Sequence, residues 1–580
     1  MSRDDVMNPG PVAGAAPPGD AAPAAVIGGA GLVVLLIGAF IELLDVTIVT
    51  VASPQIQEKL HSSYSQVQWV LAGFQLAFAA GLITGGRLGD IYGRKKMYTR
   101  GLFGFVIASI LCGLAPTAGL LIAARVLQGL TAALMYPQVL SVIQVSVPKA
   151  GRDKAYGILG AVIGISSVAG PLVGGALINA NLFGWGWRLI FFVNVPIGLV
   201  TIFFAEKLVP ESISPEKPKL DIVGVVLATT GLSMLLFGLI QGQAESWNWW
   251  IWLLIIGSLP VLGGFYLQQR SRQAGGSPLV DLRLFKTSTG ARFGTGMIVV
   301  FVLFAGISSL FLVISVYLQT AFNFNAWHTG LAFMPIAVAS MLTAGVSIPL
   351  MAKLGKRLLQ IGNAIMAGGA LWLIYIVAHH PTDITIVKMI PAEILLGLGL
   401  GMAVSTNNNI TLAEARGPSA GSAAGVQSSV SQTGNAVGVA ILGTIFFGMI
   451  ASGATTAGNT VIPQLRSQLV AASVPAPVID GVVAQFTTCL NAEAKANDPT
   501  VVPAVCKPAA NSSGPQMTSA ETAAITAAVE QASSNAEKHD FSTSMSKSLY
   551  YEVIVMGLSI LTLFFLPLRR GRDLMELEAR

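Results

Sequence analysis

Residues 86–96 read G-R-L-G-D-I-Y-G-R-K-K, and this stretch decides the fold. It separates two apolar segments, at about residues 66–87 and 98–116. Glycines let two helices reverse direction within a few residues, and clustered cations are typical of the cytoplasmic ends of membrane spans. The stretch therefore predicts a tight turn between two spanning helices at the cytoplasmic surface.

The composition around this turn indicates a membrane protein. The chain has 580 residues, of which 53% are hydrophobic and only 11% charged, whereas about 25% are charged in soluble proteins. A net charge of +6 would also suit a nucleic-acid partner. The cations lie between apolar segments, however, so we expect a lipid bilayer as the partner and no nucleic acid.

Fourteen segments have the roughly 20 apolar residues that a spanning helix needs. They lie at about residues 27–50, 66–87, 98–116, 119–143, 155–178, 187–206, 221–241, 248–268, 293–318, 327–351, 358–378, 386–409, 421–450 and 548–567. Most of the 34 Lys and Arg residues fall in alternate connections. By the positive-inside rule, both termini are then cytoplasmic, in a multi-pass protein of the cell (inner) membrane.

These spans predict an all-α polytopic protein with two six-helix bundles and two inserted spans. A weak internal repeat supports the duplication, since Gly93-Arg94-Lys95 resembles Gly355-Lys356-Arg357. The expected parts are a disordered cytoplasmic tail (1–25), an N-terminal six-helix bundle (26–206), the inserted spans with their linkers (207–292), a C-terminal six-helix bundle (293–567) and a cytoplasmic tail (568–580).

One connection, residues 451–547, is long, and by parity it is extracellular. We expect a partly ordered surface insertion with helical fragments at 464–473 and 518–533; a lid or a partner-binding element is the alternative. Cys489 and Cys506 lie in this loop, and an extracellular location would allow them to form a disulfide.

Four charged residues lie inside predicted spans, where each costs several kcal/mol and calls for an explanation. They are Glu42, Asp45, Arg125 and Glu393. Asp90 and Glu552 are expected nearer the interfaces. Glu393 lies one turn from an outer loop, where its carboxyl either takes part in proton coupling or simply reaches water.

Glu42 and Asp45 are three residues apart, so both carboxyls project from one helix face. Neighbouring carboxyls and desolvation both favour binding of a proton. The functional interpretation is proton or substrate handling, with Arg125 controlling the charge of the acid. The structural alternative is a permanent Asp45–Arg125 pair that joins spans one and four.

Polar side chains inside spans tend to face the interior of a helix bundle. Each one alone is explained by hydrogen bonding between helices, but together they predict a polar and aromatic central cavity. The candidates for this cavity are Gln75, Gln128, Tyr317, Gln319, Asn408 and Gln432.

The opening stretch resembles the G-x-L-x-D-x-x-G-R-K-K signature between spans two and three of major facilitator superfamily transporters. The resemblance assigns Gly86, Asp90, Gly93 and Arg94 to a gate motif, although the basic residue usual after the aspartate is Ile91 here. We expect Asp90 to meet the start of span thirteen, near 419–422, when the inner gate is closed.

Further motifs resemble the fourteen-span drug:proton antiporter branch of that family. Residues 44–54 are similar to L-D-x-T-[IV]-V-N-V-A-L-P, with departures at Thr50 and Ser53, and this match makes Asp45 the family's membrane acid. Arg125 opens a stretch that resembles R-x-x-Q-G, whose arginine the family implicates in proton coupling. Residues 187–198 and 278–285 are also close to patterns typical of this branch.

Residues 170–175 resemble the antiporter signature G-P-x-x-G-G. Proline bends a helix and small residues allow close packing, so we expect a bend between halves of the N-terminal bundle. The residues of this bend are Gly170, Pro171, Gly174 and Gly175.

The resemblance implies a proton-coupled antiporter that exports amphipathic small molecules by alternating access. A symporter or uniporter for a small metabolite is the alternative, and a membrane sensor or scaffold is a remote one. No nucleophile–base pair, metal spacing or phosphate loop indicates an enzyme. We expect a monomer that needs no cofactor and no metal, because the proton gradient supplies the energy.

Overall fold

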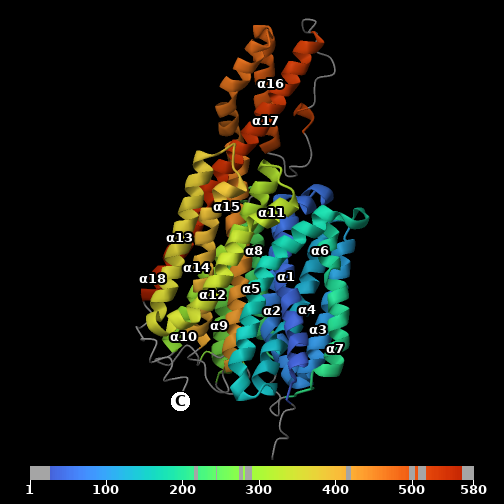
Figure 1. Cartoon of the computed structure of the whole chain (residues 1–580), viewed down its shortest axis with the longest axis vertical. Coiled ribbons are helices and arrows are strands. Elements are labelled where there is room, and N and C mark those ends of the chain that lie inside the picture. The colour runs from blue at the N-terminus through green and yellow to red at the C-terminus, as the bar shows by residue number, and fades with distance from the viewer. Residues whose placement is uncertain are drawn as a thin grey trace, which may run out of the picture.

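A computed structural model describes residues 26–213, 220–242, 244–273, 278–280, 282, 290–412, 420–494, 503–506 and 518–564. Long helices stand side by side along one axis, and a helical part rises beyond them at one end (Figure 1). The α-helices are α1 (Gly29–Leu60), α2 (Tyr64–Tyr92), α3 (Arg94–Leu114), α4 (Ala118–Ser146), α5 (Lys149–Ala180), α6 (Leu189–Phe192), α7 (Asn194–Leu208), α8 (Ile222–Gln241), α9 (Trp249–Arg272), α10 (Gly290–Val316), α11 (Ala326–Ala332), α12 (Met334–Leu354), α13 (Lys356–His379), α14 (Ile386–Leu412), α15 (Ala420–Ala471), α16 (Ala476–Ala494), α17 (Ser519–Ser548) and α18 (Tyr550–Phe564). A π-helical turn, Tyr317–Ala321, follows α10, and 3-10 turns occupy Leu182–Gly184, Gly186–Arg188 and Ala504–Cys506.

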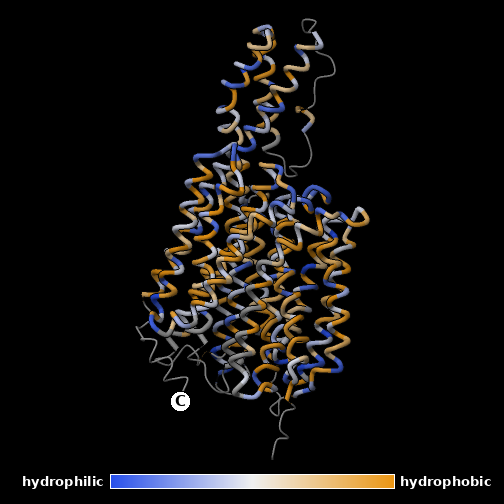
Figure 2. The backbone as a smooth tube through the Cα atoms, viewed as in Figure 1, coloured by the Kyte–Doolittle hydropathy of each residue, from blue (hydrophilic) through white to orange (hydrophobic). Residues whose placement is uncertain are grey.

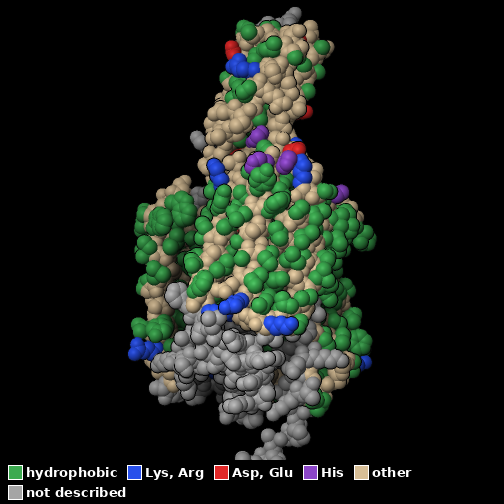
Figure 3. Space-filling view, turned by 60° about the vertical axis from the view of Figure 1, so that its left-hand side comes forward, with side chains coloured by type: hydrophobic (Ala, Val, Ile, Leu, Met, Phe, Trp, Pro, Cys, Tyr) green, Lys and Arg blue, Asp and Glu red, His purple; other side chains and the backbone are tan. Residues whose placement is uncertain are grey.

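Thirteen helical segments of the described chain are long and apolar enough to span a membrane. The shorter apolar segment Ala169–Ala180 belongs to α5, the element expected as span five. Hydrophobic residues dominate the trace of the long helices (Figure 2). On the face seen in Figure 3, hydrophobic side chains form a broad belt across the bundle, with cations gathered near its ends. This belt matches a surface in contact with lipid.

The helices form two groups with an inserted pair between them. In the N-terminal group α4 packs against α2 and α3, and α1 packs against α5; in the C-terminal group α14 packs against α12 and α13, and α10 against α15. The predicted inserted spans are α8 and α9, which contact each other. Because α8 also contacts α2 and α15, the pair lies against both groups.

Span thirteen does not end near residue 450 as expected, because α15 runs without a break over 52 residues to Ala471. The predicted fragment at 464–473 is the end of α15, and the fragment at 518–533 is the first half of α17. We call the residues of α15 from Thr455 on, α16, and α17 up to Lys538 the projection. It is the part that rises above the bundle in Figure 1.

The projection has a hydrophobic core of its own. Leu465, Ile479, Phe486 and Ala532 come from its three helices and are buried together. Cys489 of α16 forms a disulfide with Cys506, and the nearby Asn491 accepts from Thr455 of α15, so the disulfide lies towards the inner end of the projection.

Candidate functional site

Asp45 lies in the middle of α1 and is completely buried. Its carboxylate accepts hydrogen bonds from Arg125 of α4, from Nε2 of Gln128 (2.9 Å) and from Nδ2 of Asn194 on α7 (2.9 Å). Arg125 also forms an ion pair with it. One carboxylate therefore ties α1 to both α4 and α7.

The guanidinium of Arg125 is also fully engaged. Nε donates to the backbone oxygen of Val70 (3.0 Å), and Nη1 donates to Oε1 of Gln128 (2.7 Å). The ring of Phe74 lies 4.3 Å from the guanidinium carbon, a distance at which a cation is attracted to an aromatic face. Arg125 is thus fixed by α2 as well as by α1.

Two members of this network were not among the predicted site residues. Asn194 lies in the 187–198 pattern, and Ser109 of α3 accepts from Gln128 (2.9 Å) and Asn194 (3.4 Å). An asparagine inside a predicted span is a signal for Asn194, because membrane cores disfavour unpaired amides. Ser109 has no such signal, since a serine can satisfy its hydroxyl on its own helix.

Glu42 lies one turn before Asp45, and it is also completely buried. Asp45 and Arg125 both act on it electrostatically. Neither of its carboxyl oxygens has a hydrogen-bond partner among the described residues. Two carboxyls therefore share one neighbouring guanidinium, in a region closed to water.

Glu393 does not reach water, so this alternative of the sequence interpretation was wrong. It is completely buried in α14, and its oxygens have no hydrogen-bond partner in the described part of the chain. Since α14 packs against α12 and α13, Glu393 belongs to the opposite half from Asp45. Glu552, expected near an interface, is also buried, with 2% of its surface exposed.

Most of the predicted cavity residues join helices. Gln75 donates to Ser308 (3.1 Å), and Gln319 donates to the backbone oxygen of Val51 (2.9 Å), each across the two halves. Gln128 belongs to the Asp45 network, Tyr317 is hydrogen-bonded to Ser542 (3.0 Å), and Gln432 accepts from Asn435 (3.3 Å). The side chain of Asn408 lies outside the described residues.

The G-P-x-x-G-G segment lies at a junction of both halves rather than inside the N-terminal one. α5 continues through Pro171 to Ala180. A Cβ atom at Gly174 would lie 2.7 Å from the side chain of Ile48 on α1, and one at Gly175 would collide with the backbone of Ala326 on α11. The glycines therefore allow α1 and α11 to pack tightly on two sides of α5.

The gate motif forms the turn from α2 to α3. Gly93 has φ +108°, which favours glycine, and a Cβ there would lie 2.6 Å from the carboxyl of Glu211. That carboxyl accepts from the backbone N–H groups of Lys95 (3.1 Å) and Lys96 (3.3 Å) at the start of α3, a favourable place for an acid. Arg94 donates to Asp90 (2.6 Å). Residues 413–419 and the side chains of 420–424 lie outside the described residues, so the predicted partner of Asp90 cannot be placed there.

The same motif is linked to the inserted helices. Arg87 donates to the backbone oxygen of Pro278 (2.5 Å). Next to it, Asp221 caps α8 by accepting from the N–H of Gly224 (3.0 Å), and it also accepts from the N–H of Leu279 (3.3 Å). Gln268 and Gln269 of α9 donate to it as well (2.8 and 2.6 Å).

Asp221 is held as a carboxylate by these donors. Burial by itself would raise the pKa of Asp221, but the hydrogen bonds and the charge of Arg272 outweigh that effect. The pKa of Asp221 therefore lies below its ordinary value.

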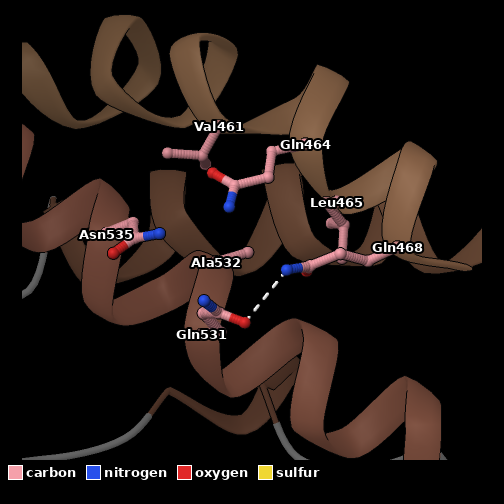
Figure 4. A pocket seen from close by; sticks show the side chains of 7 residues that line it. All are labelled: Val461, Gln464, Leu465, Gln468, Gln531, Ala532 and Asn535. Atoms are coloured by element: carbon pink, nitrogen blue, oxygen red, sulfur yellow. Dashed lines mark hydrogen bonds between the residues drawn. The ribbon is translucent and has the colours of Figure 1, made fainter.

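One small hollow lies in the projection. It lies between α15 and α17, where Gln468 donates to Gln531 (2.9 Å; Figure 4). Sites for drug-sized ligands occupy roughly 300–1,000 Å³, whereas this hollow has no room even for a water molecule, so it is too small for such a ligand.

Comparisons with known proteins agree with this architecture. A family model, "Major Facilitator Superfamily", matches residues 35–439. The chain is 36% identical over 543 residues to a probable actinorhodin transporter of Streptomyces coelicolor, a match that covers 93% of this chain and 91% of that protein. It is 32% identical over 469 residues to a puromycin resistance protein of Streptomyces alboniger, with 79% and 87% covered.

A solved structure shows the same fold. It is a bacterial homologue of the human lysosomal transporter Spinster in an inward-facing, unoccupied conformation. Its TM-score is 0.55 at 17% identity, and the match covers 94% of this chain and 97% of that one. With the family model matched over most of the bundle and the helices arranged as two groups, the chain belongs to the Major Facilitator Superfamily.

Proposed function

We propose that this protein is a proton-coupled antiporter that exports amphipathic small molecules by alternating access. The observation that carries the proposal is the buried network in which Asp45 and Glu42 share one cation, Arg125. The named relatives support the substrate class, because one is called an actinorhodin transporter and another a puromycin resistance protein.

The charges of the network explain why Asp45 and Glu42 would bind one proton between them. Asp45 and Arg125 neutralise each other, and a second ionised carboxyl at Glu42 would add an uncompensated charge in a dry interior. Such a charge costs several kcal/mol, so the two carboxyls together hold one proton. Movement of Arg125 away from Asp45 would make a second proton favourable. Proton binding and helix rearrangement would then be coupled through Arg125.

The proposed orientation places the projection outside the cell. The gate motif and its cations, Arg94, Lys95 and Lys96, lie at the other end of α2 from Tyr64, whose ring stacks on Phe447. Cations are enriched on the cytoplasmic side. The bonds of Gln319 to Val51 and of Ser315 to Thr50 (2.8 Å) join α1 to the end of α10 and the π-helical turn after it, on the projection side. These contacts correspond to a closed outer gate.

The test uses purified protein in proteoliposomes with a pH-sensitive dye inside and puromycin as the probe. Puromycin added on one side should move protons in the opposite direction, and an imposed pH gradient should drive puromycin uphill. Asp45→Asn should abolish both movements. Glu58→Gln, at the exposed end of the same helix, should keep both, since that side chain is 62% exposed.

A panel of aromatic antibiotics on cells with and without the protein would identify better substrates. Normal uphill transport by the Asp45→Asn variant would contradict the proposed role of that residue. Substrate movement without any proton movement in the wild-type protein would contradict antiport itself.

A further inference from the structure

Helices α17 and α18 carry a line of buried polar side chains that the Asp45 network does not use. Asp540, Ser544, Ser548 and Glu552 follow one another at intervals of four residues. Asp540, Ser544 and Ser548 lie one above the other on α17. Glu552 follows in the first turn of α18, after Leu549, whose backbone keeps a helical conformation. None of these four is more than 6% exposed. At 1.5 Å per residue the line extends over about 18 Å, from the base of the projection into the bundle.

The inner end of the line is Glu552. Ser309 of α10 donates to its Oε1 (3.2 Å), and a Cβ at Gly306 would lie 2.6 Å from its Oε2. Tyr551 is the titratable neighbour on the same helix, and Lys356 of α13 bonds to the backbone oxygen of Leu563 (3.1 Å), three turns away. Within the described residues, Glu552 takes part in no ion pair.

The outer end is Asp540, where α17 passes from the projection into the bundle. The hydroxyl of Ser544 lies beside its carboxyl, one turn along the helix, and Gly453 of α15 lies against it. Glu537 and Tyr64 are the titratable groups that act on this region from α17 and α2. The remaining charged groups nearby are His539 and Lys538, and Lys538 lies 5.8 Å from the centre of the Phe322 ring.

Ser548 connects the two ends. Its hydroxyl donates to the backbone oxygen of Met545 (3.0 Å), and its lone pairs remain able to accept a proton from a neighbour. Side chains four apart on a helix are about 5–6 Å from one another at Cβ. One bridging water spans such a gap between hydroxyl and carboxyl groups.

We propose that Asp540, Ser544, Ser548 and Glu552 form a proton path from the projection side to a proton-binding site at Glu552. A carboxylate without a cation in an apolar interior is strongly disfavoured relative to the neutral acid. At each step an O–H bond breaks on one oxygen as another forms on the next, so atoms and charge balance. The direction of net flow rests on the proposed antiport, because the path opens on the side to which the substrate leaves.

The test follows the carboxyl of Glu552 by infrared spectroscopy on the full-length protein in lipid nanodiscs. The carbonyl band of a protonated acid should be present at neutral pH and should lose one component in Glu552→Gln. After transfer to D₂O, the exchange of that component reports how fast protons reach Glu552. Asp540→Asn and Ser548→Val should each slow the exchange by about tenfold, the factor that corresponds to 1.4 kcal/mol of added barrier.

Two matched variants control for packing. Ser548→Thr resembles Ser548→Val in shape but keeps the hydroxyl, so it should exchange at the wild-type rate. Thr543→Val, on the exposed face of the same helix, should also leave the rate unchanged.

An unchanged acid band in Glu552→Gln would mean that Glu552 is ionised, and it would overturn the proposal. Equal exchange rates in the valine, threonine and asparagine variants would overturn the path. Neither spectrum requires a substrate. A failure of drug antiport at Asp45 would therefore leave both spectra unchanged and would be distinguished from a failure here.

Discussion

Asp45 in the N-terminal half and Glu393 in the C-terminal half are both completely buried carboxyls, yet their surroundings differ in kind. Asp45 has three donors and an ion pair with Arg125, whereas the oxygens of Glu393 have no partner among the described residues. The first carboxyl is paired with a cation, and the second has no partner among the described residues. Removal of the acid should therefore have opposite consequences in the two halves.

The largest expected effect is that of Arg125→Met. This change leaves Asp45 buried without its cation and should cost about 3–5 kcal/mol of stability, the range for a broken buried ion pair. Unfolding of the purified protein in increasing SDS measures the loss. Lys59→Met removes the exposed partner of Glu58 and should cost at most about 1 kcal/mol. Similar losses for the two variants would contradict the charged character of the Asp45 site.

The double variant Asp45→Leu with Arg125→Met makes the N-terminal site apolar. Since two apolar groups can replace a buried ion pair at little cost, most of the loss from Arg125→Met should be recovered, to within about 2 kcal/mol of the wild type. The same SDS titration measures the recovery, and the proteoliposome assay should find no proton-coupled transport. A double variant that is less stable than Arg125→Met would show that the network is needed for packing.

The Asp221→Asn variant tests a carboxylate that lies outside the spans and accepts several hydrogen bonds. The pKa of Asp221 in the folded protein lies below its ordinary value. The carboxylate therefore stabilises the fold at every pH above that ordinary value. This stabilisation is lost as the pH falls through the lowered pKa. Asparagine can still cap α8, but it removes the charge faced by Gln268, Gln269 and Arg272. At neutral pH the variant should lose about 1.5–2 kcal/mol, the lower part of the range for hydrogen bonds to a charged group. Towards acid pH the two proteins should converge. A constant difference between their unfolding midpoints from neutral to acid pH would contradict this role.

The smallest expected effect, and the one of opposite sign, is that of Glu393→Leu. A buried polar group without partners costs about 1–3 kcal/mol, so this variant should be as stable as the wild type or more stable by about 1 kcal/mol. The SDS midpoint measures the change, with Asp45→Leu alone as the contrasting variant. A clear loss of stability in Glu393→Leu would mean that its carboxyl has a partner that matters to the fold.

The fold followed from the sequence because long apolar segments and alternating cations are strong signals in a membrane protein. The predicted end of span thirteen was wrong. α15 leaves the bundle without any helix-breaking sequence near residue 450, and the alanine-rich segment beyond it continues the helix to Ala471. Hydropathy indicates where a membrane ends but does not indicate where a helix ends.

The site was predicted only in part. Asp45, Glu42 and Arg125 were predicted together and Gln128 was predicted for the central cavity, since charges and amides stand out in an apolar span. Ser109 and Asn194 could not be assigned to the site, because only the packing of α3 and α7 against α4 and α1 brings them to Asp45. The burial of Glu393 likewise depends on its neighbours α12 and α13, not on its place along α14.

The continuity of α15 also determines how the outer part of the molecule moves. Its 52 residues form a rod of about 78 Å at 1.5 Å per residue, one end of which is packed within the C-terminal half. When that half tilts by a small angle, the outer end of the rod moves further than its packed end, because displacement grows with distance from the centre of rotation. A spectroscopic label near Ala471 would therefore report the opening and closing of the transporter far more sensitively than a label at the membrane surface.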